Sequence, residues 1–159
     1  VGARAALADA ALARFREATG RDSLAVDKWL LAQATAPVAP HDAGAGRTLA
    51  RVRDLLQHAD YSVRNPNRVR ALVLAFATSN PAAFHRPDGS GYAFWAERLL
   101  ELDALNPQIA SRLARAMDRW SALAEPYRSA AREAIGRVAA KADLSADVRE
   151  VVMRALDGA

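Results

Sequence analysis

Few residues of this 159-residue chain have the type and spacing that hydrolytic or metal chemistry requires. The three histidines, His41, His58 and His85, are far apart, and none belongs to the HExxH pattern in which two helical histidines bind zinc. We interpret His58 as a side chain at a helix C-terminus, where an imidazole meets the helix dipole favourably, and His85 as a residue that fixes its own loop. The sequence has no cysteine to act as a nucleophile or thiolate ligand. The chain by itself is therefore predicted to carry no catalytic residue and no metal ligand.

A glycine-containing segment and the tryptophans also fit structural roles better than chemical ones. Residues 88–91 read DGSG but lack the lysine and the preceding strand of a phosphate-binding loop. Ser90 lies outside any GxSxG pattern, so a tight turn explains the segment better than a nucleophile. Trp29, Trp95 and Trp120 lie on apolar helical stripes, and we expect them in the core.

Two groups of arginines are the remaining candidates for binding. A guanidinium can engage a carboxylate through two parallel hydrogen bonds. Arg70 and Arg112 are the candidates that we retain, because each follows a helix start with polar groups beside it. The full groups are Arg64, Arg68 and Arg70 around an Asn-Pro-Asn sequence, and Arg112, Arg115 and Arg119 on one side of an expected helix. We interpret Arg115 and Arg119 as a solvated face.

The composition indicates a globular protein, with 52% hydrophobic and 25% charged residues. No apolar run approaches the roughly 20 residues that a membrane span needs, and charges interrupt the first 20 residues, so no signal peptide is expected. The sequence thus predicts a soluble, cytoplasmic protein. The net charge of +4 is a feature that nucleic-acid-binding proteins share. The arginines are mostly interleaved with acidic residues, however, which argues against a basic binding surface.

Apolar residues recur at helical spacing along most of the chain. The first helix is expected over about residues 3–19, with Leu7, Ala11, Phe15 and Ala18 on one face, and it should end at Gly20. A second helix, capped by Asp22 or Ser23, should run to about Thr35, and prolines 37 and 40 prevent its continuation. Loops are expected over 36–46 and 85–91. Further helices are expected over about 48–58, 92–102, 126–142 and 145–156.

Three Asn-Pro pairs mark additional helix starts. Asparagine accepts a hydrogen bond from an unpaired amide at a helix N-terminus, and proline suits the first helical position because it has no N–H. The pairs are Asn65-Pro66, Asn80-Pro81 and Asn106-Pro107. The second pair opens only a short turn over 81–84, whereas the other two lead into long apolar stripes.

These short helices with brief connections predict an all-α fold. We expect about seven or eight helices stacked in pairs as an irregular right-handed superhelix, an α-solenoid of the armadillo or HEAT kind. The sequence shows no clean period, so any repeat is irregular. We treat residues 1–159 as a single helical domain.

Several blocks of sequence, in a fixed order, resemble the C-terminal domain of the bacterial aminopeptidase N family. The resemblance covers about residues 24–113 and continues more weakly to the end. It departs from the family in the 39–46 loop, which looks longer than usual, and in the last two helices. The blocks are DKWLLAQAT (27–35), LLQH (55–58), NPNRVR (65–70), SNPAAFH (79–85), DGSGY (88–92) and NPQIASRL (106–113).

The resemblance implies a zinc exopeptidase that removes N-terminal amino acids from peptides. In that family the zinc and the catalytic residues belong to an upstream domain, which would be this chain's partner. The helical domain covers the active-site cavity and restricts the access of substrates. By this resemblance Arg70, Gln108 and Arg112 lie on the cavity side, and Arg112, helped by Gln108, would contact the distal part of peptide substrates. No nucleic-acid or membrane partner is implied.

Two other classes of function remain open at this point. A stand-alone helical-repeat scaffold would bind another protein along a concave face. A basic helical module would bind RNA or DNA with an affinity that falls steeply with salt. Neither alternative requires the NPQIASRL block, whereas the aminopeptidase interpretation does, and it also predicts an exposed apolar strip where a catalytic domain docks.

Overall fold

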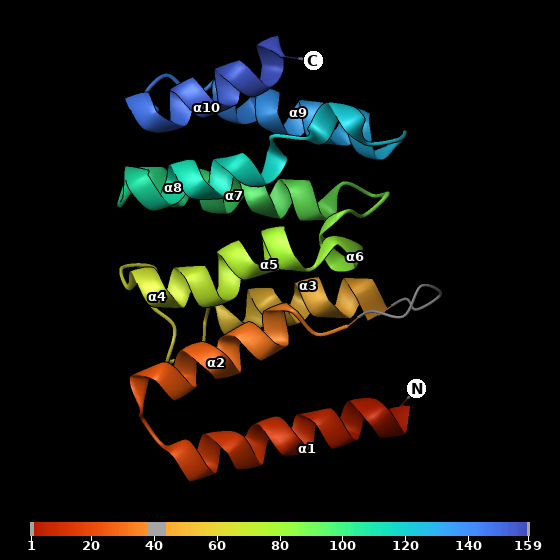
Figure 1. The fold of residues 1–159 in the computed structure, drawn as a ribbon, viewed down its shortest axis with the longest axis vertical. Coiled ribbons are helices and arrows are strands. Elements are labelled where there is room, and N and C mark those ends of the chain that lie inside the picture. The colour runs from red at the N-terminus through yellow and green to blue at the C-terminus, as the bar shows by residue number, and fades with distance from the viewer. Residues whose placement is uncertain (1, 38–43, 159) are drawn as a thin grey trace.

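The computed structural model describes residues 2–37 and 44–158, and this part of the chain is helical without a strand. Figure 1 shows the helices stacked in layers along the longest axis, with the N-terminal helix α1 at one end and α10 at the other. The helices are α1 Gly2–Thr19, α2 Ser23–Ala34, α3 Gly44–Leu55, α4 Pro66–Val69, α5 Ala75–Ser79, α6 Pro81–Phe84, α7 Ser90–Asp103, α8 Pro107–Ala114, α9 Tyr127–Ala139 and α10 Ala146–Asp157. The π-helical segment η1 covers Arg70–Leu74, and the 3-10 segments η2 and η3 cover Arg115–Met117 and Trp120–Ala122.

Successive helix pairs pack on one another as the sequence predicts. Helices α7 and α8 contact each other and are followed by the pair α9 and α10, with α10 on α8 and α9 on α7. On the N-terminal side α2 contacts η1, and α3 contacts α6. Because α4, η1 and α5 run on without a break and α8 continues into η2, the described residues form nine helices of four residues or more. The all-α prediction of stacked helix pairs is confirmed, with slightly more helices than the seven or eight expected.

The three asparagine caps are confirmed. The side chain of Asn65 accepts a hydrogen bond from the backbone N–H of Asn67 at 3.0 Å, and that of Asn106 accepts one from Ile109 at 3.2 Å. Asn80 caps α6 and is itself buried. Its amide also donates to the carbonyls of Ala34 and Ala36 at 2.9 and 3.1 Å. Asn80 therefore joins the end of α2 to the next helix pair in addition to starting a helix.

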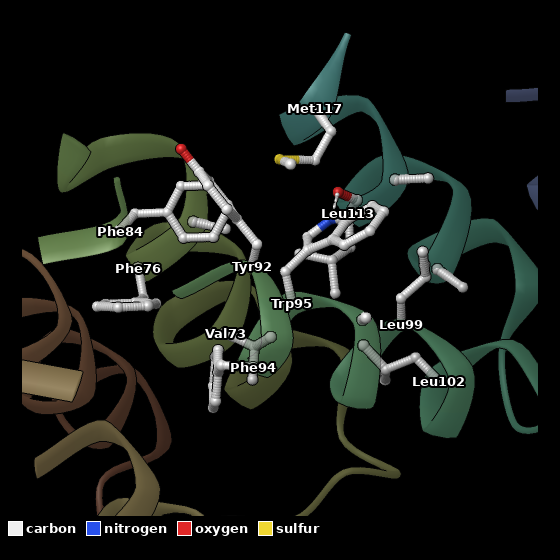
Figure 2. Packing of buried hydrophobic residues seen from close by; sticks show 14 of the residues in the cluster. Val73, Phe76, Phe84, Tyr92, Phe94, Trp95, Leu99, Leu102, Leu113 and Met117 are labelled. Carbon is white, nitrogen blue, oxygen red and sulfur yellow. Dashed lines mark hydrogen bonds between the residues drawn. The ribbon is translucent and has the colours of Figure 1, made fainter. Parts of the chain in front are cut away.

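Aromatic side chains from α5, α6 and α7 form the centre of the core. The ring of Phe76 lies edge-on to those of Phe84 and Phe94, with centroids 6.0 and 5.4 Å apart. Trp95 is 1% exposed, and its indole N–H donates to the carbonyl of Leu113 at 2.8 Å, a bond drawn as a dashed line in Figure 2. This bond satisfies the polar atom of the indole, so the ring can be buried between α7 and α8 without leaving an unpaired donor.

Some helix boundaries differ from the expected ones. Helix α3 covers Gly44–Leu55 in place of about 48–58. It ends earlier than expected because the backbone N–H groups of Gln57 and His58 donate to carbonyls three residues earlier, which is the pattern of a turn and not of an α-helix. Helix α7 begins at Ser90, two residues before the expected start, directly after Gly89 with a φ of 69°. The expected 36–46 loop falls largely on residues 38–43, outside the described part of the chain, as does His41.

The face of α1 that carries the four apolar residues noted in the sequence is exposed and does not pack in the core. Leu7 is 71% exposed and Phe15 is 37% exposed, and Ala11 and Ala18 are exposed as well. Leu12, on another face of the helix, is half-buried and lines a hollow together with Trp29 of α2. The physical reason is position, since a helix in the end layer of a stack has a neighbour on one side only (Figure 1). Within the described residues, no helix is long and apolar enough to cross a membrane.

Candidate ligand-binding face

Gln108 and Arg112, two of the three residues that the resemblance places on the cavity side, lie on the same side of α8. Both side chains are exposed on α8, and with Ser111 and Arg115 they line a shallow, open depression. The position follows from the local sequence, because the Asn106 cap fixes the start of α8 and residues 108 and 112 are one helical turn apart. The buried Ile109 and Leu113 hold the opposite face of the helix in the core.

Arg70 lies on another helix and does not line this depression. It is exposed at the junction of α4 and η1, and its guanidinium donates to the side-chain oxygen of Asn67 at 2.9 Å. The structure thus brings together two of the three residues expected on one face. Arg70 belongs to the preceding helix pair.

Of the three arginines expected on one side of a helix, Arg119 is not on the helix that carries Arg112 and Arg115. Helix α8 ends at Ala114, Arg115 lies in η2, and Arg119 precedes η3. Because α8 continues into η2 and residues three apart align in a 3-10 segment, Arg112 and Arg115 share one side of the helix, whereas Arg119 lies beyond its end at Met117. Arg115 and Arg119 are exposed, but both line a second pocket beside the depression. Arg115 lines both hollows.

This second pocket, which we call the interlayer pocket, lies between two helix pairs. One wall comes from α5, α6 and His85, and the other from η2, η3 and Leu123. Its buried apolar lining residues are Ala77, Met117 and Trp120. Sequence patterns did not reveal it, because its two walls come from separate stretches of the chain, residues 77–85 and 115–123.

The contacts of His85 agree with the expectation that this residue orders its own loop. Its Nδ1 lies 2.9 Å from the hydroxyl of the buried Tyr92. Burial lowers the pKa of His85 below the 6.5 of an exposed histidine. Burial, and to a lesser extent Tyr127, raises the pKa of Tyr92 to about 12. At neutral pH the pair is therefore an uncharged imidazole bonded to a phenol.

We expect His85 to make the protein less stable in acid. Because its pKa is lowered in the folded state, the unfolded chain binds more protons below about pH 6.5, and stability is lost as the pH falls through the folded pKa. His85→Gln should reduce this loss, since glutamine does not titrate and can still bond to Tyr92. The measurement is the free energy of unfolding in urea at about pH 7.5 and about pH 5. If the wild type and His85→Gln lost the same free energy of unfolding between these two pH values, His85 would not be the group that destabilises the protein in acid.

The DGSG segment is an ordered turn. The guanidinium of Arg86 donates to both carboxylate oxygens of Asp88, at 3.2 and 2.8 Å, and Asp88 also accepts from the hydroxyl and the backbone N–H of Ser90. These hydrogen bonds, from Arg86 first and then from Ser90, hold the pKa of Asp88 far below its usual range. Within residues 2–37 and 44–158, no group of three or more His, Asp or Glu side chains could hold a metal ion.

Arg68 is the residue whose role the sequence did not reveal. It was grouped with Arg64 and Arg70 around the first Asn-Pro pair, yet its side chain is 10% exposed, whereas theirs are at the surface. It forms an ion pair with Asp27 and donates to two backbone carbonyls. The sequence does place Arg68 three residues after the Asn65 cap and next to the apolar Val69. An exposed arginine could occupy the same position, so the local sequence does not predict that Arg68 is buried.

Comparison with known proteins assigns this fold to a family. Residues 1–157 match the family model described as "Domain of unknown function (DUF3458_C) ARM repeats". The chain belongs to this family. The ARM-repeat description agrees with the armadillo-like solenoid predicted from the sequence and with the stacked pairs of Figure 1.

Relatives of this DUF3458_C domain confirm the resemblance to aminopeptidase N. It is 39% identical over 156 residues to aminopeptidase N of Escherichia coli (strain K12), covering 98% of this chain and 17% of the relative. Aminopeptidase N of Caulobacter vibrioides is 40% identical over 146 residues, which is 92% of this chain and 16% of the relative. The chain thus spans about a sixth of the length of these proteins.

A solved structure shows the same arrangement of helices. The crystal structure of Legionella pneumophila aminopeptidase A in complex with aspartic acid matches with a TM-score of 0.85 and 30% sequence identity. The match covers 98% of this chain and 17% of that one. The similarity therefore extends over nearly all of the DUF3458_C domain and a small part of a larger enzyme.

Proposed function

We propose that this DUF3458_C domain is the C-terminal helical domain of a zinc metallo-aminopeptidase that removes N-terminal amino acids from peptides. In this proposal the domain covers the active-site cavity, restricts the entry of substrates and contributes polar and basic residues to the channel, but does not catalyse the reaction alone. The observation that carries it is the 35–40% identity to aminopeptidase N of three bacteria over 92% or more of this chain.

The proposal assigns zinc to the larger protein. An aminopeptidase of this kind needs three protein ligands and one open position on the metal. The described residues contain no cluster that could supply them, so the ligands would come from the upstream domain.

The exposed apolar face of α1 supports docking of that upstream domain. Leu7 and Phe15 stand at the end of the stack, on a helix whose opposite side already packs on α2. Helices of globular proteins normally bury an apolar face, and exposed ones mark interaction surfaces. In this proposal the upstream domain of the same polypeptide covers this face.

Arg70, Gln108 and Arg112 are proposed to face the channel. Arg112 is exposed, and its guanidinium has no hydrogen-bond or ion-pair partner within the described residues, so it is free to bind a substrate. A peptide with a free C-terminus brings a carboxylate, which a guanidinium binds through two parallel hydrogen bonds. Gln108, one turn away, can add a neutral hydrogen bond.

The test compares peptides with and without a C-terminal charge. In the full-length protein, Arg112→Gln should raise KM for trialanine by about five-fold or more, because a charged hydrogen bond at an exposed site is lost. The KM for trialanine amide and both kcat values should hardly change, since the contact is far from the reacting bond. Arg132→Gln, an exposed arginine on α9, is the matched control. If the ratio of KM for trialanine to KM for trialanine amide were the same in the Arg112→Gln and Arg132→Gln variants, Arg112 would not bind the substrate carboxylate.

The broader proposal has its own test. The full-length protein should contain about one zinc per chain and lose its activity on alanyl peptides when the zinc is chelated. A zinc-free protein without peptidase activity would overturn the proposal and favour a helical scaffold.

A further inference from the structure

The interlayer pocket has the groups that a free apolar amino acid requires. Its apolar lining includes the buried Met117 and Trp120 and the half-buried Leu123, together with Ala77, Pro81 and Ala116. The indole N–H of Trp120 donates to the carbonyl of Ala155 at 2.9 Å, so this donor is already satisfied and the ring is fixed as a wall. The pocket can therefore accept an aliphatic side chain without leaving the indole unpaired.

Charges of both signs line the same pocket. Arg115, Asp118 and Arg119 belong to its lining and are exposed at its rim. None of these three side chains has a hydrogen-bond or ion-pair partner in the described part of the chain. Most other arginines of the fold do have partners, as Arg68 has Asp27 and Arg86 has Asp88. The three rim charges are thus available to a ligand.

We propose that the interlayer pocket binds a free α-amino acid with an apolar side chain. The guanidiniums of Arg115 and Arg119 bind its carboxylate, Asp118 binds its ammonium group, and Met117, Trp120 and Leu123 pack against its side chain. Two positive charges and one negative charge suit a zwitterion better than a simple cation. The opposite wall includes His85, which is uncharged at neutral pH and so adds no third positive charge.

This site is distinct from the depression around Gln108 and Arg112, whose lining residues are all polar or charged, and only Arg115 lines both. The inference does not depend on the proposed function, because the pocket is formed by residues of this chain alone. Where the proposed function holds, the ligand is a product of the reaction, and the pocket would retain released amino acids next to the channel.

The experiment counts molecules of labelled L-leucine bound per chain of the full-length protein by equilibrium dialysis. The double variant Arg115→Gln/Arg119→Gln should bind leucine at this site at least about ten-fold more weakly, since charged hydrogen bonds are lost. The matched control Arg132→Gln/Arg137→Gln removes two exposed arginines of α9 and should bind as the wild type does. Equal binding by the two double variants would overturn the inference.

A second variant tests the assignment of the ammonium group. Asp118→Asn should weaken the binding of L-leucine but not that of 4-methylpentanoate, which has the same side chain and carboxylate without the amine. A wild-type protein that binds 3-methylbutylamine, which lacks the carboxylate, as tightly as leucine would also overturn the inference. Peptidase activity is measured on the same samples. Leucine binding without activity would contradict only the proposed function, and activity without leucine binding at this pocket would contradict only this inference.

Discussion

Replacing Arg68 with alanine is expected to lower the free energy of unfolding by about 3–5 kcal/mol. The guanidinium of Arg68 donates to the carbonyl of Asp60 at 3.0 Å and to that of Ser23 at 2.9 Å, and it pairs with Asp27. Removing it leaves the part-buried carboxylate of Asp27 and two carbonyls without their donor, and it removes the bonds that join α2 to α4 through this side chain. The measurement is urea unfolding followed by far-ultraviolet circular dichroism.

Arg64 provides the matched control for Arg68. It is exposed four residues earlier, so Arg64→Ala should change the free energy of unfolding by no more than about 0.5 kcal/mol. If the two variants were equally stable, the buried ion pair would contribute nothing measurable. Arg68→Lys tests geometry, because a lysine keeps the charge but cannot supply the planar set of donors that reaches all three acceptors.

Gly91→Ala is expected to destabilise the protein by about 3 kcal/mol, the upper end of the usual range for overpacking. A Cβ atom at this position would lie 1.9 Å from the carbonyl oxygen of Phe84 and 2.9 Å from its carbonyl carbon. These are backbone atoms at the end of α6, so relief requires that α6 and α7 move apart. Phe84 is fully buried, so such a movement disrupts the core between the two helices. The free energy of unfolding measures the effect.

The same substitution at Gly136 should raise the free energy of unfolding instead of lowering it. Gly136 lies inside α9, and an added Cβ would meet nothing within 4 Å. Alanine restricts the unfolded chain more than glycine does, so Gly136→Ala should stabilise the protein by about 0.5–1 kcal/mol. A destabilisation of similar size in both variants would show that the contact with Phe84 is not what requires glycine at position 91.

The sequence by itself determined the helical elements and most of their ends. The Asn65, Asn80 and Asn106 caps were predictable, because each accepts hydrogen bonds from backbone amides two or three residues along the chain. The core face of residues 92–102 was predictable for a similar reason, since Tyr92, Trp95, Leu99 and Leu102 recur at helical spacing and are all buried. The resemblance to aminopeptidase N likewise depended on blocks of adjacent residues.

Only the tertiary structure decided which residues with similar local sequence are buried, paired or exposed. Arg68 and Arg64 flank the same Asn-Pro pair, and the difference between them comes from Ser23 and Asp27, more than 40 residues away. The face of α1 with Leu7 and Phe15 has the spacing of a core face but lies at the end of the stack, where no neighbouring layer covers it. Local signals depend on bonds within a few residues, whereas burial and pockets depend on which distant helices are stacked together, and that information is spread over the whole chain.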